Sequence, residues 1–189
     1  YDSKSNGDVE NAVKQVTGLL RTLKICLEKR IGMKIPSSHP IISWLIEHTA
    51  WLLNTRTVGA DGVTAYHRTK GRSYAKRSVG FGEYVMHMLP TKGPQKEARA
   101  KLDPKWAHGF VLGYSKSSNE YYVFEESSKK MLKVKSVQRV PAEQRWKPEG
   151  LQAINVTCQQ MYTRREARGV HTEGFVEDPN AKPHDQGLV

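Results

Sequence analysis

The sequence contains little cysteine, and this scarcity excludes two kinds of site. Its 189 residues include two cysteines, Cys26 and Cys158, which stand far apart and form no CxxC pair. A zinc site built on paired cysteines is therefore excluded, and so is a disulfide framework. The absence of such a framework suits a reducing compartment, so we expect an intracellular protein of the nucleus or the cytoplasm.

Long apolar runs are missing too. No segment reaches the ~18 consecutive apolar residues of a membrane-spanning helix, so we expect no membrane partner. The chain begins with Tyr1 and carries no signal peptide, and a start without Met suggests a fragment or a processed piece. Hydrophobic residues make up 38% of the sequence. This share lies below the roughly 45–50% typical of globular domains, so we expect part of the chain to remain unpacked.

Positive charge, by contrast, is in excess. The sequence has 30 Lys and Arg residues against 19 Asp and Glu, which gives a net charge of +11. Such an excess favours an anionic partner, because basic side chains release counterions from phosphates and steer association. We therefore expect DNA or another nucleic acid as the partner. The alternative is a soluble basic protein without one.

Two helices are predicted in the first part of the chain. Apolar residues recur at helical spacing from Val9 to Leu27, which predicts a helix from about Gly7 to Arg30, capped by Ser5 or Asn6 and stopped at Gly32. The same spacing predicts a second helix from about Pro40 to Asn54. Its two tryptophans, Trp44 and Trp51, are interpreted as core residues.

Residues 55–80 are polar, basic and rich in glycine. Tyr66 and Tyr74 stand among the basic side chains. This composition predicts a basic loop with stacking aromatics, useful against a nucleic-acid backbone. A solvated linker is the alternative. The basic and histidine side chains of this segment are Arg56, His67, Arg68, Lys70, Arg72, Lys76 and Arg77.

From Phe81 onward the apolar period changes to two, and strands are expected. Their short lengths and hairpin-sized connections predict a small antiparallel meander or barrel, with a basic edge that includes Lys133 and Lys135. A short helix is possible from Leu151 to Arg168, and disorder is expected beyond Gly169. The predicted strands cover 84–89, 109–114, 121–124, 131–134 and 137–140.

One carboxylate stands out as a candidate for chemistry. Glu10 is predicted in the first turn of a helix, with Lys14 one turn further on. That context suits a metal-binding acid beside a phosphate. A two-metal site needs several converging carboxylates, however, and the other acids form no such set by spacing. Taken alone, Glu10 is interpreted as an acid that complements the helix dipole.

Five motifs in order resemble the integrases of copia-type retrotransposons. Ser5 to Asn11 resembles the last carboxylate motif, and the segment from His39 to Asn54 resembles the helix that follows. The run Gly62 to Tyr66 and then Gly71-Arg72 resembles the next motif, except that Ala65 stands where the family usually has proline. The last two motifs, which resemble the exit strand and the small all-β domain, cover 81–85 and 102–114.

The resemblance covers about residues 3–146 and implies an α+β chain. Residues 1–80 would be the helical C-terminal remnant of an RNase-H-like catalytic core, 81–147 a small all-β domain, and 148–189 a tail. In such enzymes three acids hold two Mg²⁺ ions, and Glu10 matches the third acid. Lys14 matches a position that contacts DNA. The first two acids should precede Tyr1, so we expect this chain alone to be inactive as a strand transferase.

The sequence thus predicts a fragment of a retrotransposon integrase, or Pol polyprotein, that acts in DNA integration and retains nucleic-acid binding. Two alternatives remain: a basic nucleic-acid-binding module unrelated to integrases, and a non-functional retroelement relic. Glu10 is the candidate catalytic and metal-binding residue. The candidate nucleic-acid-binding residues are Lys14, Arg21, Arg56, Arg68, Lys70, Arg72, Lys76, Arg77, Lys133 and Lys135.

Overall fold

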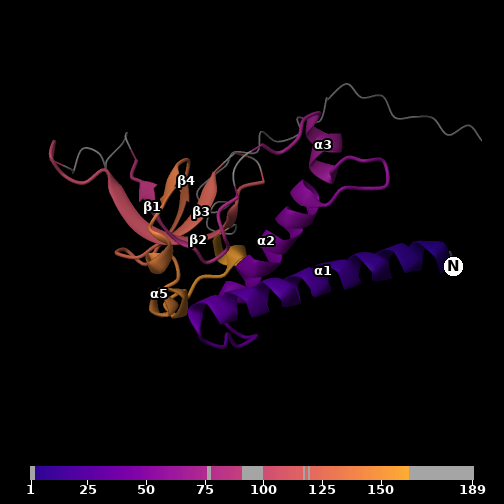
Figure 1. Cartoon of the computed structure of the whole chain (residues 1–189), viewed down its shortest axis with the longest axis horizontal. Helices are drawn as coiled ribbons and strands as arrows, with labels where there is room; N and C mark the ends of the chain where they lie inside the picture. Colours follow the sequence, from indigo (N-terminus) through magenta and orange to yellow (C-terminus); the bar gives the residue numbers. More distant parts are fainter. Residues whose placement is uncertain (1–2, 76–77, 91–99, 117, 119, 162–189) are drawn as a thin grey trace, which may run out of the picture.

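Two helices and a five-stranded antiparallel sheet make up most of the fold, which confirms the α+β prediction (Figure 1). The computed structural model describes residues 3–75, 78–90, 100–116, 118 and 120–161. The expected disorder beyond Gly169 lies outside these residues. Among the described helices, none combines the length and the apolar character that a membrane span needs.

The first helix, α1, spans Ser3–Ile31 and is longer than predicted. Gly32 ends it with a positive φ of 67°, which confirms the predicted stop, since glycine adopts this conformation without steric cost. The predicted start was wrong, because capping preferences do not fix a boundary where the helix can continue through serine, asparagine and glycine. Glu10 consequently lies beyond the first turn, which contains no acid.

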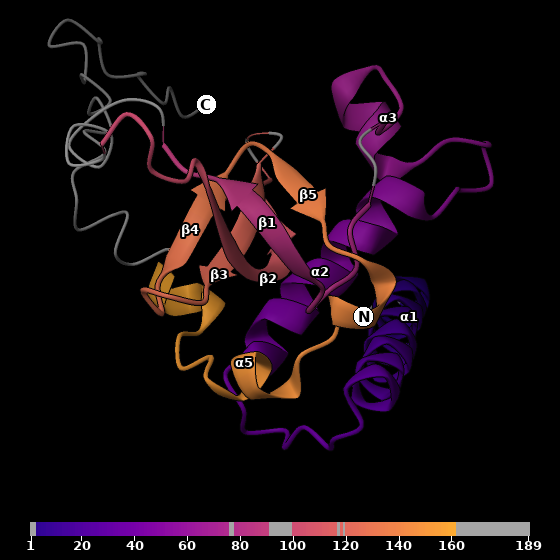
Figure 2. The same cartoon turned by 60° about the vertical axis from the view of Figure 1, so that its left-hand side comes forward.

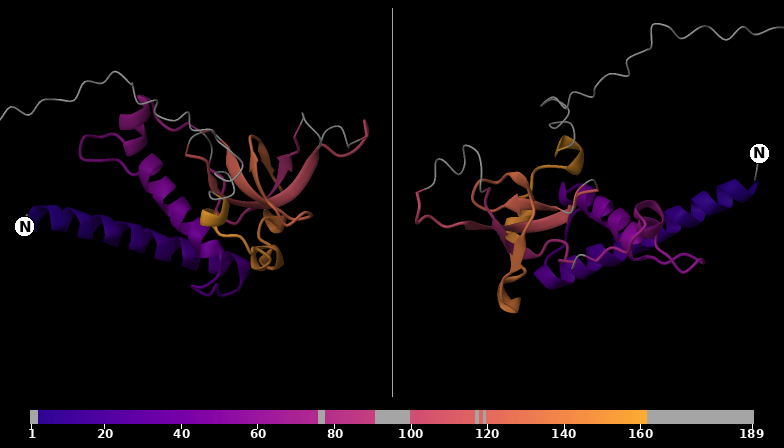
Figure 3. Two further views of the ribbon diagram at one scale, coloured as in Figure 1. Left: turned by 180° about the vertical axis from the view of Figure 1, so that it is seen from behind. Right: turned by 90° about the horizontal axis from the view of Figure 1, so that it is seen from above.

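Only the C-terminal half of α1 packs against the rest of the protein. Leu27 is buried, and Leu20 and Leu23 are half-buried against the main core. Val9 and Val13, on the same stripe, are 60% and 58% exposed. Figure 3 shows the N-terminal end of α1 projecting away from the sheet in both views. The predicted apolar stripe therefore has an uncovered half.

The second helix, α2, spans Ile41–Arg56 and carries both tryptophans into the core. Trp44 is 1% exposed and lies 5.5 Å from Tyr122, centroid to centroid. Trp51 is also buried and stacks on Tyr114. The interpretation of both tryptophans as core residues is confirmed. A short helix that the sequence analysis missed, α3, follows at Ala65–Lys70.

The sheet is an open meander with a fifth strand added at one side (Figure 2). Its order is β4-β3-β2-β1-β5, so β4 and β5 are free edges and the sheet does not close into a barrel. A register shift between Val111 and Gly113 interrupts the β2–β3 pairing. The strands are β1 Tyr84–Met88, β2 Trp106–Tyr114, β3 Tyr121–Glu125, β4 Met131–Val134 and β5 Val137–Arg139.

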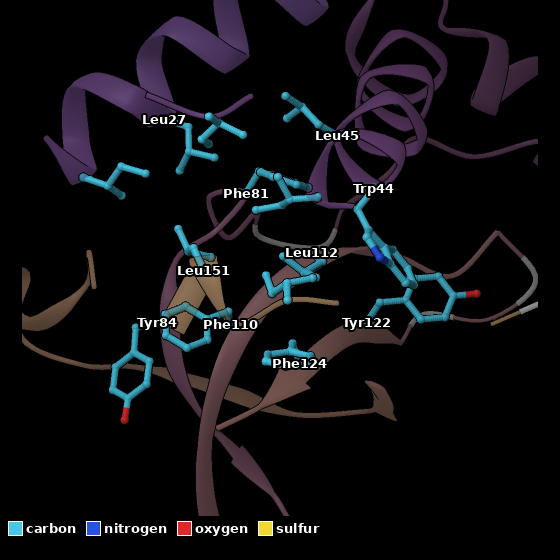
Figure 4. Packing of buried hydrophobic residues seen from close by; sticks show 14 of the residues in the cluster. Leu27, Trp44, Leu45, Phe81, Tyr84, Phe110, Leu112, Tyr122, Phe124 and Leu151 are labelled. Atoms are coloured by element: carbon cyan, nitrogen blue, oxygen red, sulfur yellow. The ribbon is translucent and has the colours of Figure 1, made fainter. Parts of the chain in front are cut away.

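The main core lies between the helices and one face of the sheet (Figure 4). Phe110 and Phe124 from neighbouring strands are fully buried there, together with Leu45 from α2. Helix α5, Pro148–Gln152, adds Leu151 to the same cluster. Gly150 lies so close to the ring of Phe110 that an added Cβ would overlap it.

The segment after α5 is tied directly to α2. The indole Nε1 of Trp44 donates to the carbonyl of Val156 at 2.7 Å. The backbone N–H of Cys158 donates to the hydroxyl of Ser43 at 3.0 Å. Cys158 is buried in the main core. Residues far apart in the sequence therefore share one core with the sheet.

A buried glutamate, Glu83, lies just before β1 and contacts the side chains of Arg139 and Arg145. Glu83 is 1% exposed, and Arg139 contacts both of its carboxylate oxygens at 2.8 Å. Arg145 lies 3.6 Å from the same group, and the N–H of Gly80 donates to it at 2.9 Å. These contacts compensate the desolvation of a buried charge. Arg139 thus has a carboxylate partner in Glu83.

Truncation of Trp44 should strongly destabilise the fold. We expect Trp44→Ala to lower the free energy of unfolding by about 3–5 kcal/mol, because it leaves a cavity and removes the contact with Val156. Ile46→Ala on the same helix is the matched control, since Ile46 is 45% exposed, and should cost well under half as much. Urea denaturation followed by circular dichroism measures both. Equal losses would contradict the assignment of Trp44 to the core.

Candidate nucleic-acid interface

A pocket of about 450 Å³ lies where the C-terminal half of α2 meets α3 and the start of the β2–β3 connection. Its wall combines aromatic rings, basic side chains and small polar groups, and none of the described residues that line it is acidic. Three segments of the chain build it. The lining residues are Trp51, Asn54, Thr55, Ala65, Tyr66, Thr69, Lys70, Arg72, Tyr74, Ser115, Lys116 and Ser118.

Local capping explains why α3 forms inside a segment predicted to be a loop. The side chain of Thr64 accepts from the N–H of His67 at 3.1 Å and caps the helix start. Gly71, with φ of 66°, ends the helix in the left-handed conformation. An isolated bridge between Val58 and Thr64 closes the preceding loop. This short helix carries Tyr66 and Lys70 to the pocket.

Arg68 holds that loop closed and is not available as a simple surface cation. Its Nε donates to Asp61 Oδ2 at 2.8 Å, and its Nη2 donates to the other carboxylate oxygen. The hydrogen bond from Arg68 lowers the pKa of Asp61 to about 2. The sequence analysis counted Arg68 among the nucleic-acid-binding candidates, but its guanidinium is engaged with this carboxylate.

Three aromatic rings, Trp51, Tyr66 and Tyr74, line the pocket, and Tyr114 packs behind Trp51. Trp51 stacks on Tyr114 with centroids 3.8 Å apart and planes at 8°. Tyr74 meets Trp51 edge-on at 5.2 Å, and Tyr66 meets Tyr74 edge-on at 5.2 Å. The Tyr114 hydroxyl accepts from the N–H of Val79 at 2.6 Å. The hydroxyl and the stacking fix the back of the pocket, while Tyr66 and Tyr74 remain half-buried.

The basic residues around the pocket differ in how far they are engaged. Lys70 and Arg72 are exposed and form no ion pair with any residue that the structure describes. Lys116 Nζ lies 2.9 Å from a carboxylate oxygen of Glu47. The guanidinium of Arg56 lies 5.5 Å over the ring of Tyr74 and donates to Ser78 at 2.8 Å. Lys70 and Arg72 are thus the cations best placed to meet an anion.

The remaining candidates that the structure describes lie outside the pocket. Lys14 and Arg21 are exposed on α1, and Lys135 is exposed after β4. Lys133 Nζ lies 3.2 Å from Glu120, with its side chain only 19% exposed. Lys76 and Arg77 lie outside the described residues. The structure therefore brings Lys70 and Arg72 together with aromatic rings and leaves the other described candidates apart or differently engaged.

Glu10 is exposed on α1. Within the part of the chain that the structure describes, no group of three or more His, Cys, Asp or Glu residues could hold a metal ion. One carboxylate cannot hold two Mg²⁺ ions, because such a site needs several converging ligands. The described residues therefore do not fit a two-metal site, and no chemical step is assigned to Glu10.

Sequence reasoning missed several polar residues of the pocket, among them Asn54, Lys116 and Ser118. Asn54 was predicted only as a helix end, and the other two only as parts of a hairpin connection. Nothing in their local sequence shows that the end of α2 lies beside the β2–β3 connection. The one available signal was the basic character of Lys116.

A family model matches the sheet. Residues 87–150 match the model described as the retroviral polymerase SH3-like domain. This region runs from β1 through β5 to α5, and the match supports a retroelement Pol-related protein. The match thus supports the predicted resemblance to retroelement Pol proteins, without reaching the copia type. No curated protein and no solved structure matches the chain significantly.

A buried histidine lies behind the aromatic wall. His48 on α2 is 4% exposed, and its ring stacks near Trp51 at 5.5 Å and Tyr114 at 5.8 Å. Its Nδ1 has no hydrogen-bond partner among the described residues. Burial lowers the pKa of His48 to about 4, because a charged imidazolium would be desolvated there. The neutral ring is therefore part of the folded state.

Acidification should weaken the fold through His48. Below pH 6.5 the unfolded chain takes up a proton that the folded chain binds only near pH 4. The free energy of unfolding should thus fall by about 1.4 kcal/mol per pH unit across this window, roughly 3 kcal/mol in all. His48→Leu should remove this part of the slope in urea titrations at stepped pH. The exposed His108 provides the control, and an unchanged slope in His48→Leu would refute the assignment.

Proposed function

We propose that this chain is a nucleic-acid-binding part of a copia-type retrotransposon integrase, encoded within a Pol polyprotein and acting in DNA integration. The match of residues 87–150 to a retroviral polymerase domain carries the proposal. In this assignment residues 1–80 belong to an RNase-H-like core, and residues 81–147 form the small all-β domain that follows it.

The basic pocket supports the nucleic-acid part of the proposal. Lys70 and Arg72 present two cations at an aromatic pocket, and the described part of its lining includes no acid. Arg and Lys contacts to phosphates supply sequence-independent affinity and release counterions. The net charge of +11 steers a polyanion toward the protein at longer range. Binding through these groups would position DNA without reading its sequence.

Binding to duplex DNA should depend strongly on salt and on the pocket cations. We expect the affinity of the full chain to fall steeply between about 50 and 200 mM salt. Lys70→Gln combined with Arg72→Gln should weaken binding and lower the slope of log K against log salt by about two, one for each lost phosphate contact. Fluorescence anisotropy with a labelled duplex measures both quantities.

The matched control removes the same charge elsewhere. Lys101 and Lys105 are exposed within the β1–β2 connection and do not line the pocket. Lys101→Gln combined with Lys105→Gln should change the salt slope less than the pocket pair does. An equal change in the salt slope would place the interface elsewhere. An affinity that does not depend on salt concentration would contradict a nucleic-acid function. The latter outcome would favour the alternative of a relic without a selected role.

The chain alone should bind DNA without transferring strands. We expect no Mg²⁺-dependent joining of a short DNA end to a target duplex, because the described residues supply too few ligands for two metal ions. Glu10→Gln should leave the DNA affinity within about twofold, since Glu10 is exposed and lies outside the pocket. Strand transfer by the wild-type chain that Glu10→Gln abolishes would overturn this expectation.

A further inference from the structure

We infer that the aromatic pocket holds an unpaired base of a single-stranded nucleic acid, with the adjoining phosphates on Lys70 and Arg72. The inference rests on the proposed nucleic-acid function and specifies its substrate. It makes an unpaired segment, such as a frayed end or an overhang, the preferred ligand over a fully paired duplex.

The shape of the pocket is the first argument. About 450 Å³ of space lies within walls contributed by α2, α3 and the β2–β3 connection. This volume falls in the range of roughly 300–1,000 Å³ found for small-molecule sites. A duplex is too wide to enter such a space and keeps its bases stacked inside. A base reaches a pocket only when it is unpaired or flipped out of the stack.

The aromatic wall is the second argument. One face of Trp51 is already covered by Tyr114, and Tyr74 closes its edge, so Trp51 serves as the back of the pocket. Tyr66 and Tyr74 line the pocket and are only half-buried. Rings of this kind stack on bases of any sequence, because every base has an aromatic face. Tyr66 contacts Tyr74, which in turn contacts Trp51.

The polar groups of the pocket match the polar parts of a nucleotide. Asn54 is exposed at the pocket, and its carboxamide offers both donors and an acceptor to the edge of a base. Lys70 and Arg72 stand at the same pocket and match the phosphates on either side of that base. An aromatic wall, an amide and two cations together favour a nucleotide over a purely apolar ligand.

The test compares a single strand with a paired duplex and with an abasic strand that carries the same charge as the single strand. Four labelled probes are titrated against the full chain by fluorescence anisotropy: a short DNA single strand, the RNA strand of the same sequence, the blunt DNA duplex, and an abasic DNA strand that keeps its phosphates. We expect the DNA strand to bind about tenfold more tightly than the duplex and the abasic strand. The RNA arm distinguishes the two sources of unpaired bases.

The protein side of the test uses Tyr66. Tyr66→Ala should weaken single-strand binding about tenfold and leave duplex binding unchanged, whereas Tyr66→Phe should retain the wild-type preference. Circular dichroism verifies folding. If Tyr66→Ala does not fold, the abasic comparison on the wild-type chain decides the question.

The four probes distinguish failure of the base pocket from failure of the proposed function. Equal, salt-sensitive affinity for the single strand, the duplex and the abasic strand would overturn the base pocket and leave the proposed function standing. Failure to bind any of the four probes would overturn the proposed function itself.

Discussion

The seating of α2 on the sheet is the constraint on which the rest of the structure depends. Trp44 and Trp51 stand two helical turns apart on one face of α2, and they enter different apolar clusters. Trp44 packs beside Tyr122, while Trp51 stacks on Tyr114. The same helix therefore joins the main core to the smaller cluster around Tyr114. Its C-terminal half also forms the back of the aromatic pocket. Packing of Trp51 in the buried cluster therefore holds this wall in place.

Most secondary structure follows from periodicity in the sequence, and the failures have specific causes. Short apolar runs around Tyr84 and Val111 mark β1 and β2, although β2 is buried continuously from Gly109 to Tyr114 and does not alternate. The spacing of Trp44 and Trp51 marks α2. Helix α3 escaped prediction because it is too short to show an apolar period. Its signals were Thr64 and Gly71, whose capping roles emerge only once the bridge at Val58 closes the loop.

The candidate site was less predictable than the fold, because charge counting does not show which cations have partners. Arg68 and Lys70 stand two residues apart, yet Arg68 is bound to Asp61 while Lys70 lines the pocket. Lys133 likewise meets Glu120 across the sheet. Lys116 joins the pocket through chain topology, which local sequence does not encode. The role of Glu10 in a metal site stays a prediction, since that role needs ligands beyond the described residues.

The close approach of Gly150 to Phe110 shows that the packed core does not end where the family match ends. The family match ends at residue 150, but the core continues into Leu151, Ile154 and Cys158. On the other side, the match begins inside β1 and omits Tyr84, which is buried against Phe110. The segment that the family model matches is therefore smaller than the segment that contributes to the main core. The family match and the packed core therefore end at different residues of the chain. Helix α2 contributes to the core but lies outside the family match.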